Sequence, residues 1–223
     1  FSSESFVLLR NVQIIRLINV RKKIYLATEN KHKVHEFSNL LKQKNIRFYE
    51  PPLTAFPFPE EVGKTFKENA ILKTIHIVEK CGLPSLADDS GLEVNCLNGE
   101  PGIFSSRYSK SGASNDNIKK LLSNLAGVQK AERKAKFTCC LAYNKADGSK
   151  PLVFESSIEG EITEDFSGKY GFGYDPIFLV PELGLTFAEI TENEKNRISH
   201  RAKAFNLFLK EVKYLNLLED NKR

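Results

Sequence analysis

Apolar and polar positions alternate along the chain in a pattern that predicts short strands separated by amphipathic helices. Apolar residues recur at helical spacing after residues 30, 65 and 199, and each of these runs follows a good N-capping residue (Asn30, Thr65 and Ser199). An Asp147-Gly148 turn predicts a hairpin. Short apolar runs predict strands at residues 24–27, 91–94, 136–143, 152–155 and 177–180. The chain is therefore expected to combine strands and helices along its length.

Two helix starts carry the capping-box pattern, in which a threonine is followed three residues later by a glutamate. These pairs are Thr65 with Glu68 and Thr191 with Glu194. The helix that starts at Thr65 is expected to end at Gly82, because glycine commonly follows a helix C-terminus. Its apolar positions predict an inner face made of Phe66, Ala70, Ile71, Ile75 and Val78.

Acidic residues lie on both sides of this helix in the sequence. Glu60 and Glu61 precede it, and Asp88 and Asp89 follow it. They would be held at opposite ends of the helix unless the next strand runs back alongside it. A strand-helix-strand crossover does bring such segments toward a common sheet edge.

The stretch Ala87-Asp88-Asp89-Ser90-Gly91 combines two adjacent carboxylates, a hydroxyl and a glycine. Adjacent aspartates repel each other, so a fold buries them only beside a cation or strong hydrogen-bond donors. The glycine allows a sharp turn or close approach of the backbone to a ligand. An acidic surface turn is the alternative interpretation, because Asp, Ser and Gly are ordinary turn residues.

A strand, a polar turn and a helix start coincide at residues 24–33. The turn offers free backbone N–H groups and the positive end of a helix dipole, with Lys31 and Lys33 beside them. This arrangement predicts a phosphate-binding loop. Simple helix capping with solvated lysines is the alternative.

Two aromatic residues, Phe172 and Tyr174, stand between glycines ahead of an apolar strand. Such a segment is suited to presenting flat ring faces at a cleft, where a base would stack. A corner relieved by glycine is the alternative. His200 and Arg201 fall in the first turn of the last helix, where cations oppose the helix dipole. Their position hints at an anionic ligand, although single cations at helix starts are usually solvated.

Composition sets limits on the function. The chain has 223 residues and a formal charge of +5 spread along its length, which suits an anionic small molecule as well as nucleic acid. No apolar run approaches the roughly 20 residues of a membrane span. The four cysteines show no zinc-site spacing and are expected to be reduced core residues.

The N-terminal stretch is apolar but interrupted by Arg10, Arg16 and Arg21, which argues against a secretory signal. Residues 1–22 are therefore expected to form an N-terminal extension of unknown role, and residues 23–223 a single domain. The Ser and Arg content of the extension is also compatible with an organelle transit segment, although a cytoplasmic location is the main expectation.

Six sequence blocks in this order resemble the signature of the Ham1 family, also called inosine triphosphate pyrophosphatases or RdgB-like proteins. The resemblance covers about residues 23–218 and is closer to the bacterial-type branch. The blocks are Thr28-x-Asn30-x-x-Lys33, Thr65-Phe66-x-Glu68-Asn69-Ala70, Ala87-Asp88-Asp89-Ser90-Gly91-Leu92-Glu93-Val94, Pro101-Gly102-Ile103-Phe104-Ser105-x-Arg107-Tyr108, Phe172-Gly173-Tyr174-Asp175-Pro176-x-Phe178 and Ser199-His200-Arg201-x-Lys203-Ala204.

The resemblance implies an α/β fold with a long mixed central sheet flanked by helices, forming two lobes around an active-site cleft. It implies Mg²⁺-dependent hydrolysis of ITP, dITP and XTP to the monophosphate and pyrophosphate by a homodimer. No nucleic-acid or membrane partner is expected. A Maf-like pyrophosphatase of other base specificity and a nucleic-acid-binding protein remain the alternatives.

The same resemblance implies a role for each matching residue. Asp89 would be the catalytic base, and Glu61 with Asp89 would hold the metal. The chemistry of the residues adds two expectations: Asp88 orients the phosphate loop, and Arg201, which carries only donors, pairs with the 6-oxo group of the base. Substrate contacts would come from Thr28, Glu29, Asn30, Lys31, His32, Lys33, Ser90, Phe172, Gly173, Tyr174, Asp175, Lys195, His200 and Arg201. Glu29 replaces a small residue common in the family and adds negative charge near the phosphates.

Overall fold

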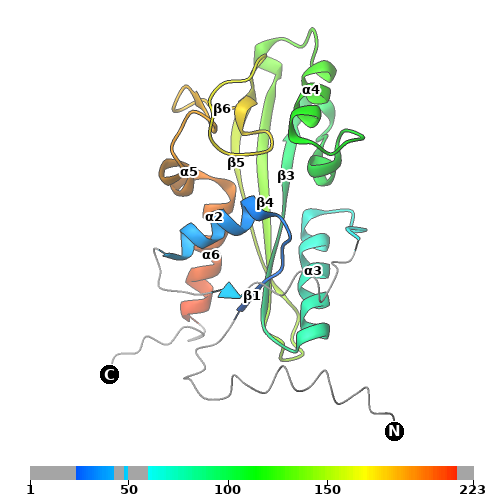
Figure 1. Ribbon diagram of the computed structural model, residues 1–223, viewed down its shortest axis with the longest axis vertical. Coiled ribbons are helices and arrows are strands. Elements are labelled where there is room, and N and C mark those ends of the chain that lie inside the picture. Colours follow the sequence, from blue (N-terminus) through cyan, green and yellow to red (C-terminus); the bar gives the residue numbers. More distant parts are fainter. Residues whose placement is uncertain (1–23, 43–47, 50–59, 215–223) are drawn as a thin grey trace.

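A computed structural model describes residues 24–42, 48–49 and 60–214, which form a mixed sheet with helices on both faces (Figure 1). The strand order is β2-β1-β3-β4-β5-β6-β7. β2 and β3 run parallel to β1, whereas every later neighbouring pair is antiparallel. The predicted α/β fold with a long mixed sheet is confirmed. The strands are β1 (Ile24–Leu26), β2 (Phe48–Tyr49), β3 (Ser85–Val94), β4 (Lys134–Asn144), β5 (Leu152–Ile162), β6 (Phe178–Val180) and β7 (Leu185–Thr186).

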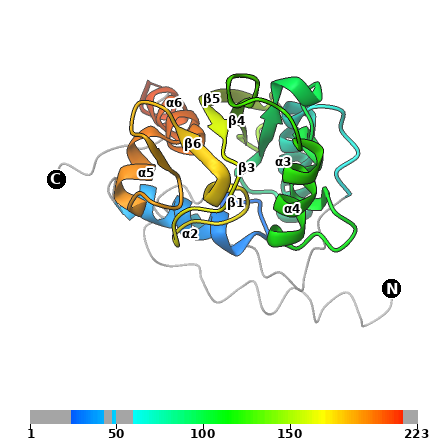
Figure 2. The ribbon, with the colours of Figure 1, turned by 90° about the horizontal axis from the view of Figure 1, so that it is seen from above.

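Helices cover the sheet on opposite sides, as the view from above shows (Figure 2). Side chains alternate along β4: Cys139, Leu141 and Tyr143 pack with α2 and α6, whereas Cys140 and Ala142 pack with α3. The helices are α2 (Lys31–Lys42), α3 (Phe66–Cys81), α4 (Ser114–Asn124), α5 (Glu192–Ile198) and α6 (His200–Tyr214), with short 3₁₀ turns η2 (Asn95–Leu97), η3 (Gly102–Arg107), η4 (Lys130–Glu132) and η5 (Asp175–Ile177).

Of the four hydrophobic clusters among the described residues, the two largest lie along the long strands β3, β4 and β5. One core joins β1, α2 and α6 to the lower half of the sheet in Figure 1, around Phe37, Phe205 and Phe208. The other joins α4 and β6 to the upper half, around Leu121 and Phe178. The protein therefore has the two lobes that the family resemblance implies.

Several local predictions are confirmed. β4 and β5 form the hairpin predicted at Asp147-Gly148, pairing from Lys134↔Glu161 to Tyr143↔Leu152. Thr191 and Glu194 form a complete capping box, and Ser199 Oγ accepts a hydrogen bond from the Ala202 N–H at 3.2 Å. The predictions for residues 1–22 lie outside the described residues. No described helix has both the length and the apolar character needed to cross a bilayer.

The structure excludes one alternative interpretation and corrects one local prediction. The acidic stretch is not the surface turn of the alternative interpretation: residues 85–94 form one continuous strand, with Asp88 and Asp89 only 1% and 5% exposed. Thr65 caps its helix as predicted, accepting from the Glu68 N–H at 3.1 Å. Glu68, however, accepts from the Lys64 N–H at 2.6 Å, so the interaction completes the cap one residue earlier than a capping box would.

Candidate active site

A cleft of about 550 Å³ lies between the two lobes. β1 pairs with β3 only as far as Leu86, and the chain then leaves the sheet at Ala27. The next residues of β3 therefore face the cleft with an open strand edge. All but one of the predicted site residues line this cleft, namely Thr28, Glu29, Asn30, His32, Lys33, Glu61, Asp89, Ser90, Phe172, Gly173, Tyr174, Asp175, Lys195, His200 and Arg201; Lys31 does not.

Asp88 and Asp89 are neighbours in sequence but point to opposite faces of the sheet. Asp88 pairs in register with Leu141, whose side chain packs in the core with α2 and α6. Asp89 pairs with Cys140, which packs against α3. Successive side chains of a strand alternate between faces, so the two carboxylates are separated by the sheet itself. Each carboxylate pairs with cations on its own face, so no metal shared by the two is needed to keep them adjacent.

On the first face, Asp88 holds two cations. Its carboxylate lies 3.1 Å from Lys33 Nζ and 3.0 Å from Arg201 Nη2, and Ser90 Oγ donates to it at 3.2 Å. Burial alone would raise the pKa of Asp88, but Lys33 and Arg201 hold that pKa well below its usual value. Asp88 is thus a charged anchor that positions the lysine of the predicted phosphate loop.

On the second face, Lys73 bridges the two predicted metal ligands. Its Nζ lies 2.6 Å from Glu61 Oε1 and 2.9 Å from Asp89 Oδ1. Asn69 Nδ2 donates to the other Asp89 oxygen at 3.1 Å, and Arg107 Nη1 pairs with Glu61 at 2.5 Å. Because β3 runs back alongside α3, the acidic clusters on either side of that helix do meet.

The two carboxylates have different affinities for protons. Burial would raise the pKa of Glu61, but Lys73 and Arg107 lower that pKa to about 2. Burial raises the pKa of Asp89, and the charge of Glu61 adds to the increase although Lys73 opposes it. Pairs of groups whose environments separate their pKa values are typical of acid–base sites. Asp89 is the better proton acceptor of the two.

Sequence reasoning missed Lys73 and Asn69. The inward face of α3 is rotated from the predicted one: Asn69, Thr74 and Ile77 are buried, whereas Ile75 is only half-buried. Asn69 and Lys73 are one helical turn apart, and each lies three residues from an inner-face position (Phe66 or Ala70). The available signal was that these polar residues lie at helical spacing from apolar inner-face positions. Residues of a solvated helix face would instead lie on the side of the helix away from Phe66 and Ala70.

The carboxylates around Lys73 fit a divalent cation. Magnesium prefers oxygen ligands and usually takes one or two protein carboxylates, the rest being waters and phosphate oxygens. Glu61 and Asp89 each direct an oxygen at the same ammonium, which marks a position where a cation is favourable. No cluster of three or more His, Cys, Asp or Glu side chains with metal-binding geometry occurs among the described residues. The site therefore suits a metal completed by substrate oxygens.

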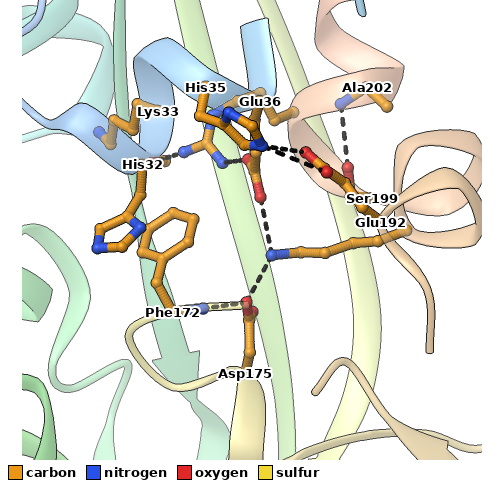
Figure 3. Close-up of polar contacts among 12 residues, drawn as sticks. His32, Lys33, His35, Glu36, Phe172, Asp175, Glu192, Ser199 and Ala202 are labelled. Carbon is orange, nitrogen blue, oxygen red and sulfur yellow. Dashed lines mark hydrogen bonds and ion pairs between the residues drawn. The ribbon is translucent and has the colours of Figure 1, made fainter. Parts of the chain in front are cut away.

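A buried ion-pair chain crosses the cleft beside Phe172 (Figure 3). Lys195 Nζ lies 2.8 Å from Glu36 Oε1 and 2.6 Å from Asp175 Oδ2, and Asp175 accepts from the Phe172 N–H at 2.8 Å. Glu36 also pairs with Arg201 Nη1. Burial would raise the pKa of Glu36, but Arg201 and Lys195 lower that pKa to about 2.

Glu36 is a third residue that sequence reasoning missed. It stands next to Phe37 and four residues before Leu40, both buried, so its position in α2 predicts an inward side chain. In the structure it joins α2 of one lobe to α5 and α6. Glu36 thereby fixes Lys195 and Arg201, which the family resemblance assigns to the substrate.

The turn before α2 is organised by Asn30. Its Oδ1 accepts from the His32 N–H at 2.9 Å and from the Lys33 N–H at 3.2 Å, and Thr28 Oγ1 accepts from the Asn30 N–H at 3.2 Å. Asn30 therefore caps the helix, as the alternative interpretation expects. That interpretation also expects solvated lysines, which holds for Lys31 but not for Lys33, because Lys33 pairs with Asp88.

The aromatic segment divides between cleft and core. The Phe172 ring is half-buried and stacks on His32. Tyr174 is buried in the upper core, and its hydroxyl donates to the Ser105 carbonyl at 3.0 Å. Gly171 (φ +74°) is required here, because a Cβ would lie 2.1 Å from Asp175 Oδ2. Phe172 and Tyr174 both line the cleft, and Phe172 presents the more exposed ring to it.

His200 is buried and stacks on Phe137 at 4.9 Å between ring centroids. Burial and the neighbouring Arg201 hold the pKa of His200 well below its usual value, so it is neutral at physiological pH. Its Nδ1 has no hydrogen-bond partner among the described residues. A buried polar atom without a partner at a cleft is suited to a ligand contact.

The chain is similar to known proteins over most of its length. The model of the Ham1 family matches residues 24–211. A dITP/XTP pyrophosphatase of Methylococcus capsulatus is 44% identical over 187 residues, covering 83% of this chain and 93% of the relative. A HAM1 protein from Coxiella burnetii has a similar structure (TM-score 0.78, 42% identity, covering 86% of this chain and 99% of that one), as has the Staphylococcus aureus Ham1 protein (TM-score 0.76, 37% identity, covering 87% and 100%).

Proposed function

The chain belongs to the Ham1 family, and on this premise we propose that its cleft hydrolyses deaminated purine nucleoside triphosphates. It is a nucleoside triphosphate pyrophosphatase, and ITP, dITP and XTP are its proposed substrates. The products are the nucleoside monophosphate and pyrophosphate. The observation that carries the proposal is the Glu61–Lys73–Asp89 cluster, which lines the same cleft as the turn before α2 and the ring of Phe172.

The proposed chemistry is attack of water on the α-phosphorus. Asp89 accepts a proton from the water while the oxygen of that water forms a bond to the α-phosphorus. The bond from the α-phosphorus to the bridging oxygen breaks, and pyrophosphate leaves. The position of Asp89 supports this role, because Asp89 lines the cleft together with Lys33 and Ser90. Glu61 and Asp89 would hold Mg²⁺, which when bound supplies positive charge to the phosphate oxygens.

Lysines would offset the remaining phosphate charge. Lys33 is anchored by Asp88 at the helix start, in the position expected for a triphosphate contact. Ser90 is two residues after Asp88 on β3, and its Oγ accepts a hydrogen bond from Arg201 Nη2 at 2.8 Å. Lys31 lies outside the cleft lining, so its proposed contribution is limited to long-range attraction.

Selectivity for a 6-oxo purine is proposed to come from donor-only side chains. Arg201 uses N–H groups on Asp88, Glu36 and Ser90, which makes it less available to the base than its sequence position suggests. Lys195 has three N–H donors, of which Glu36 and Asp175 take two. A remaining donor would pair with a 6-oxo group, whereas the 6-amino group of adenine would stay unpaired at a loss of about 1–3 kcal/mol.

A substrate panel with pyrophosphate readout tests the proposed function. The purified protein is incubated with Mg²⁺ and, in separate reactions, ITP, dITP, XTP, GTP, ATP and pyrimidine triphosphates. Highest kcat/KM for ITP, dITP and XTP is expected. Preference for pyrimidine triphosphates would instead indicate a Maf-like specificity, and loss of hydrolysis in a chelator would support the metal.

Assembly, location and domain extent stay predictions. The family resemblance predicts a homodimer, which light scattering would test, and a cytoplasmic location. A single catalytic domain spanning residues 23–223 is also proposed, and a protein truncated to these residues should retain full kcat/KM.

A further inference from the structure

The imidazole of His32 lies flat against Phe172, the ring assigned above to the nucleobase. The ring centroids are 4.8 Å apart, and the ring planes differ by 8°. His32 belongs to the first turn of α2, whereas Phe172 belongs to the segment before β6. The stack therefore connects the two lobes across the cleft (Figure 3).

Among the described residues, three aromatic or cationic side chains lie close to the Phe172 ring, and two of them are held in place. Lys195 Nζ is 4.9 Å from the ring centroid and is fixed by two buried ion pairs. Arg201 Cζ is 6.0 Å away and is fixed by Glu36 and Asp88. His32 is exposed, and within the described part of the chain no hydrogen bond or ion pair holds its imidazole. His32 is the neighbour that can move.

We propose that His32, stacked on Phe172, covers the ring face that a base would use, and that an incoming base displaces it. The proposal rests on the proposed function, since it takes Phe172 as the base-stacking ring. Stacked rings are themselves about 4.5 Å or more apart between centroids, so a third ring between these two would need roughly twice their separation. Rotation of an exposed side chain makes that space without separating the lobes.

The cover acts on binding and leaves the chemistry unchanged. The apparent affinity of the site is reduced by the fraction of molecules in which Phe172 is uncovered. This reduction is the same for every base, because the His32 stack is broken before any base is recognised. Such an effect raises KM for all substrates by one factor and leaves kcat unaltered.

The test compares His32→Ala with His32→Phe and a matched control. His32→Ala is expected to lower KM for ITP, XTP and GTP by a common factor of about two to ten, the range given by one ring stack, with kcat retained. Calorimetry should show inosine monophosphate binding tighter by the same factor. His32→Phe keeps a flat cover and should bind no tighter than the wild type. His35→Ala removes an exposed histidine of the same helix, which contacts Glu192 at 3.1 Å, and should leave KM unchanged.

A raised or unchanged KM in His32→Ala would overturn the cover, since the imidazole would then contact the substrate or not reach it. Equal tightening by the Ala and Phe variants would also overturn it. A wild-type protein that releases no pyrophosphate from any triphosphate would refute the proposed function instead. Monophosphate binding needs no turnover, so it distinguishes the two failures.

Discussion

At the scale of single residues, the alternation of side chains along β3 assigns different partners to two adjacent aspartates. Asp88 is neutralised by Lys33 and Arg201 on one face, and Asp89 faces Lys73 on the other. The first carboxylate is held ionised, and the second has a raised pKa. The site thus obtains an anchor and a proton acceptor from consecutive positions.

Replacing Asp89 by asparagine should lower kcat by about 10² or more, because general-base catalysis of this kind contributes that much. Asparagine keeps the size of the side chain and an acceptor for Asn69. Pyrophosphate release at saturating Mg²⁺ and ITP measures the effect, and circular dichroism checks the fold. Near wild-type turnover would exclude Asp89 as the base.

Glu36 should contribute a pH-dependent part of the stability. Its pKa is about 2 in the folded chain against an ordinary value of 4.5, so its contribution is present above pH 4.5 and is lost as the pH falls toward 2. Glu36→Gln is expected to lower the free energy of unfolding by on the order of 3 kcal/mol at pH 7. Urea titrations from pH 7 to pH 3 should show the difference from wild type shrinking below pH 4.5.

Glu192→Gln is the matched control for this substitution. Glu192 is an exposed glutamate that contacts His35 from α5, so its removal should change the free energy of unfolding by less than about 1 kcal/mol. An effect of Glu36→Gln that is equally small, or that does not vary between pH 7 and pH 3, would contradict the buried role of Glu36.

At this scale, sequence patterns identify residues whose local context is unusual. Asn30 and Thr28 stand at a helix start, so their capping role could be predicted. Asp88-Asp89 is an unusual pair, so its place in a functional site could be predicted as well. Lys73 and Glu36 carry a weaker signal, because only their spacing from apolar inner-face positions of α3 and α2 distinguishes them from charged residues of a solvated helix face. Only the packing of α3 and α2 against the sheet turns these two side chains inward.

At the scale of elements, the position of η3 depends on Gly91. A Cβ at this position would lie 2.4 Å from the Gly102 carbonyl oxygen and 2.5 Å from Ser105 Oγ. The close approach lets Ser105 Oγ accept from the Leu92 N–H at 2.9 Å and donate to the Gly102 carbonyl at 2.6 Å. One wall of the cleft is therefore set by the absence of a side chain on β3.

Gly91→Ala should lower the free energy of unfolding by about 3 kcal/mol, the upper part of the range for overpacked sites, because the overlap is with backbone. It should also reduce kcat/KM, since Gly91 lines the cleft. Thermal unfolding and the ITP assay measure the two effects. Gly99→Ala is the control: its φ is +87° with no atom near a new Cβ, so a loss of only about 1 kcal/mol is expected. Equal losses would show that the close approach is unimportant.

Elements with strong local signals could be predicted from the sequence, and those made by tertiary pairing could not. The β4–β5 hairpin and the starts of α3, α5 and α6 follow from a turn and from capping residues. The strand containing Asp88 and Asp89 does not, because Asp, Ser and Gly are poor strand formers. The burial of Asp88 and Asp89 in β3 is stabilised by cations from α2, α3 and α6. A prediction from the sequence of the strand alone does not include these cations.

At the scale of the whole molecule, one sheet supports the two largest hydrophobic clusters of the described residues. β3, β4 and β5 run through both lobes, and the cleft opens where β1 leaves the edge of β3. The sequence predicted a long mixed sheet only through family resemblance, because strand order depends on contacts distant in sequence. The cleft depends on that strand order, because it forms where the short strand β1 ends beside the long strand β3.

The long pairing of β3 with β4 has a consequence for how the site comes into being. The register runs without interruption from Ser85↔Asn144 to Val94↔Ala135, and it includes Asp88 and Asp89 at its centre. Such non-local pairs stabilise the chain only after the loop between the strands has been closed, at a cost in entropy. The aspartates therefore reach their cations only when both lobes share a finished ladder. A nascent or partly unfolded chain has no competent site, so catalytic competence reports completed folding.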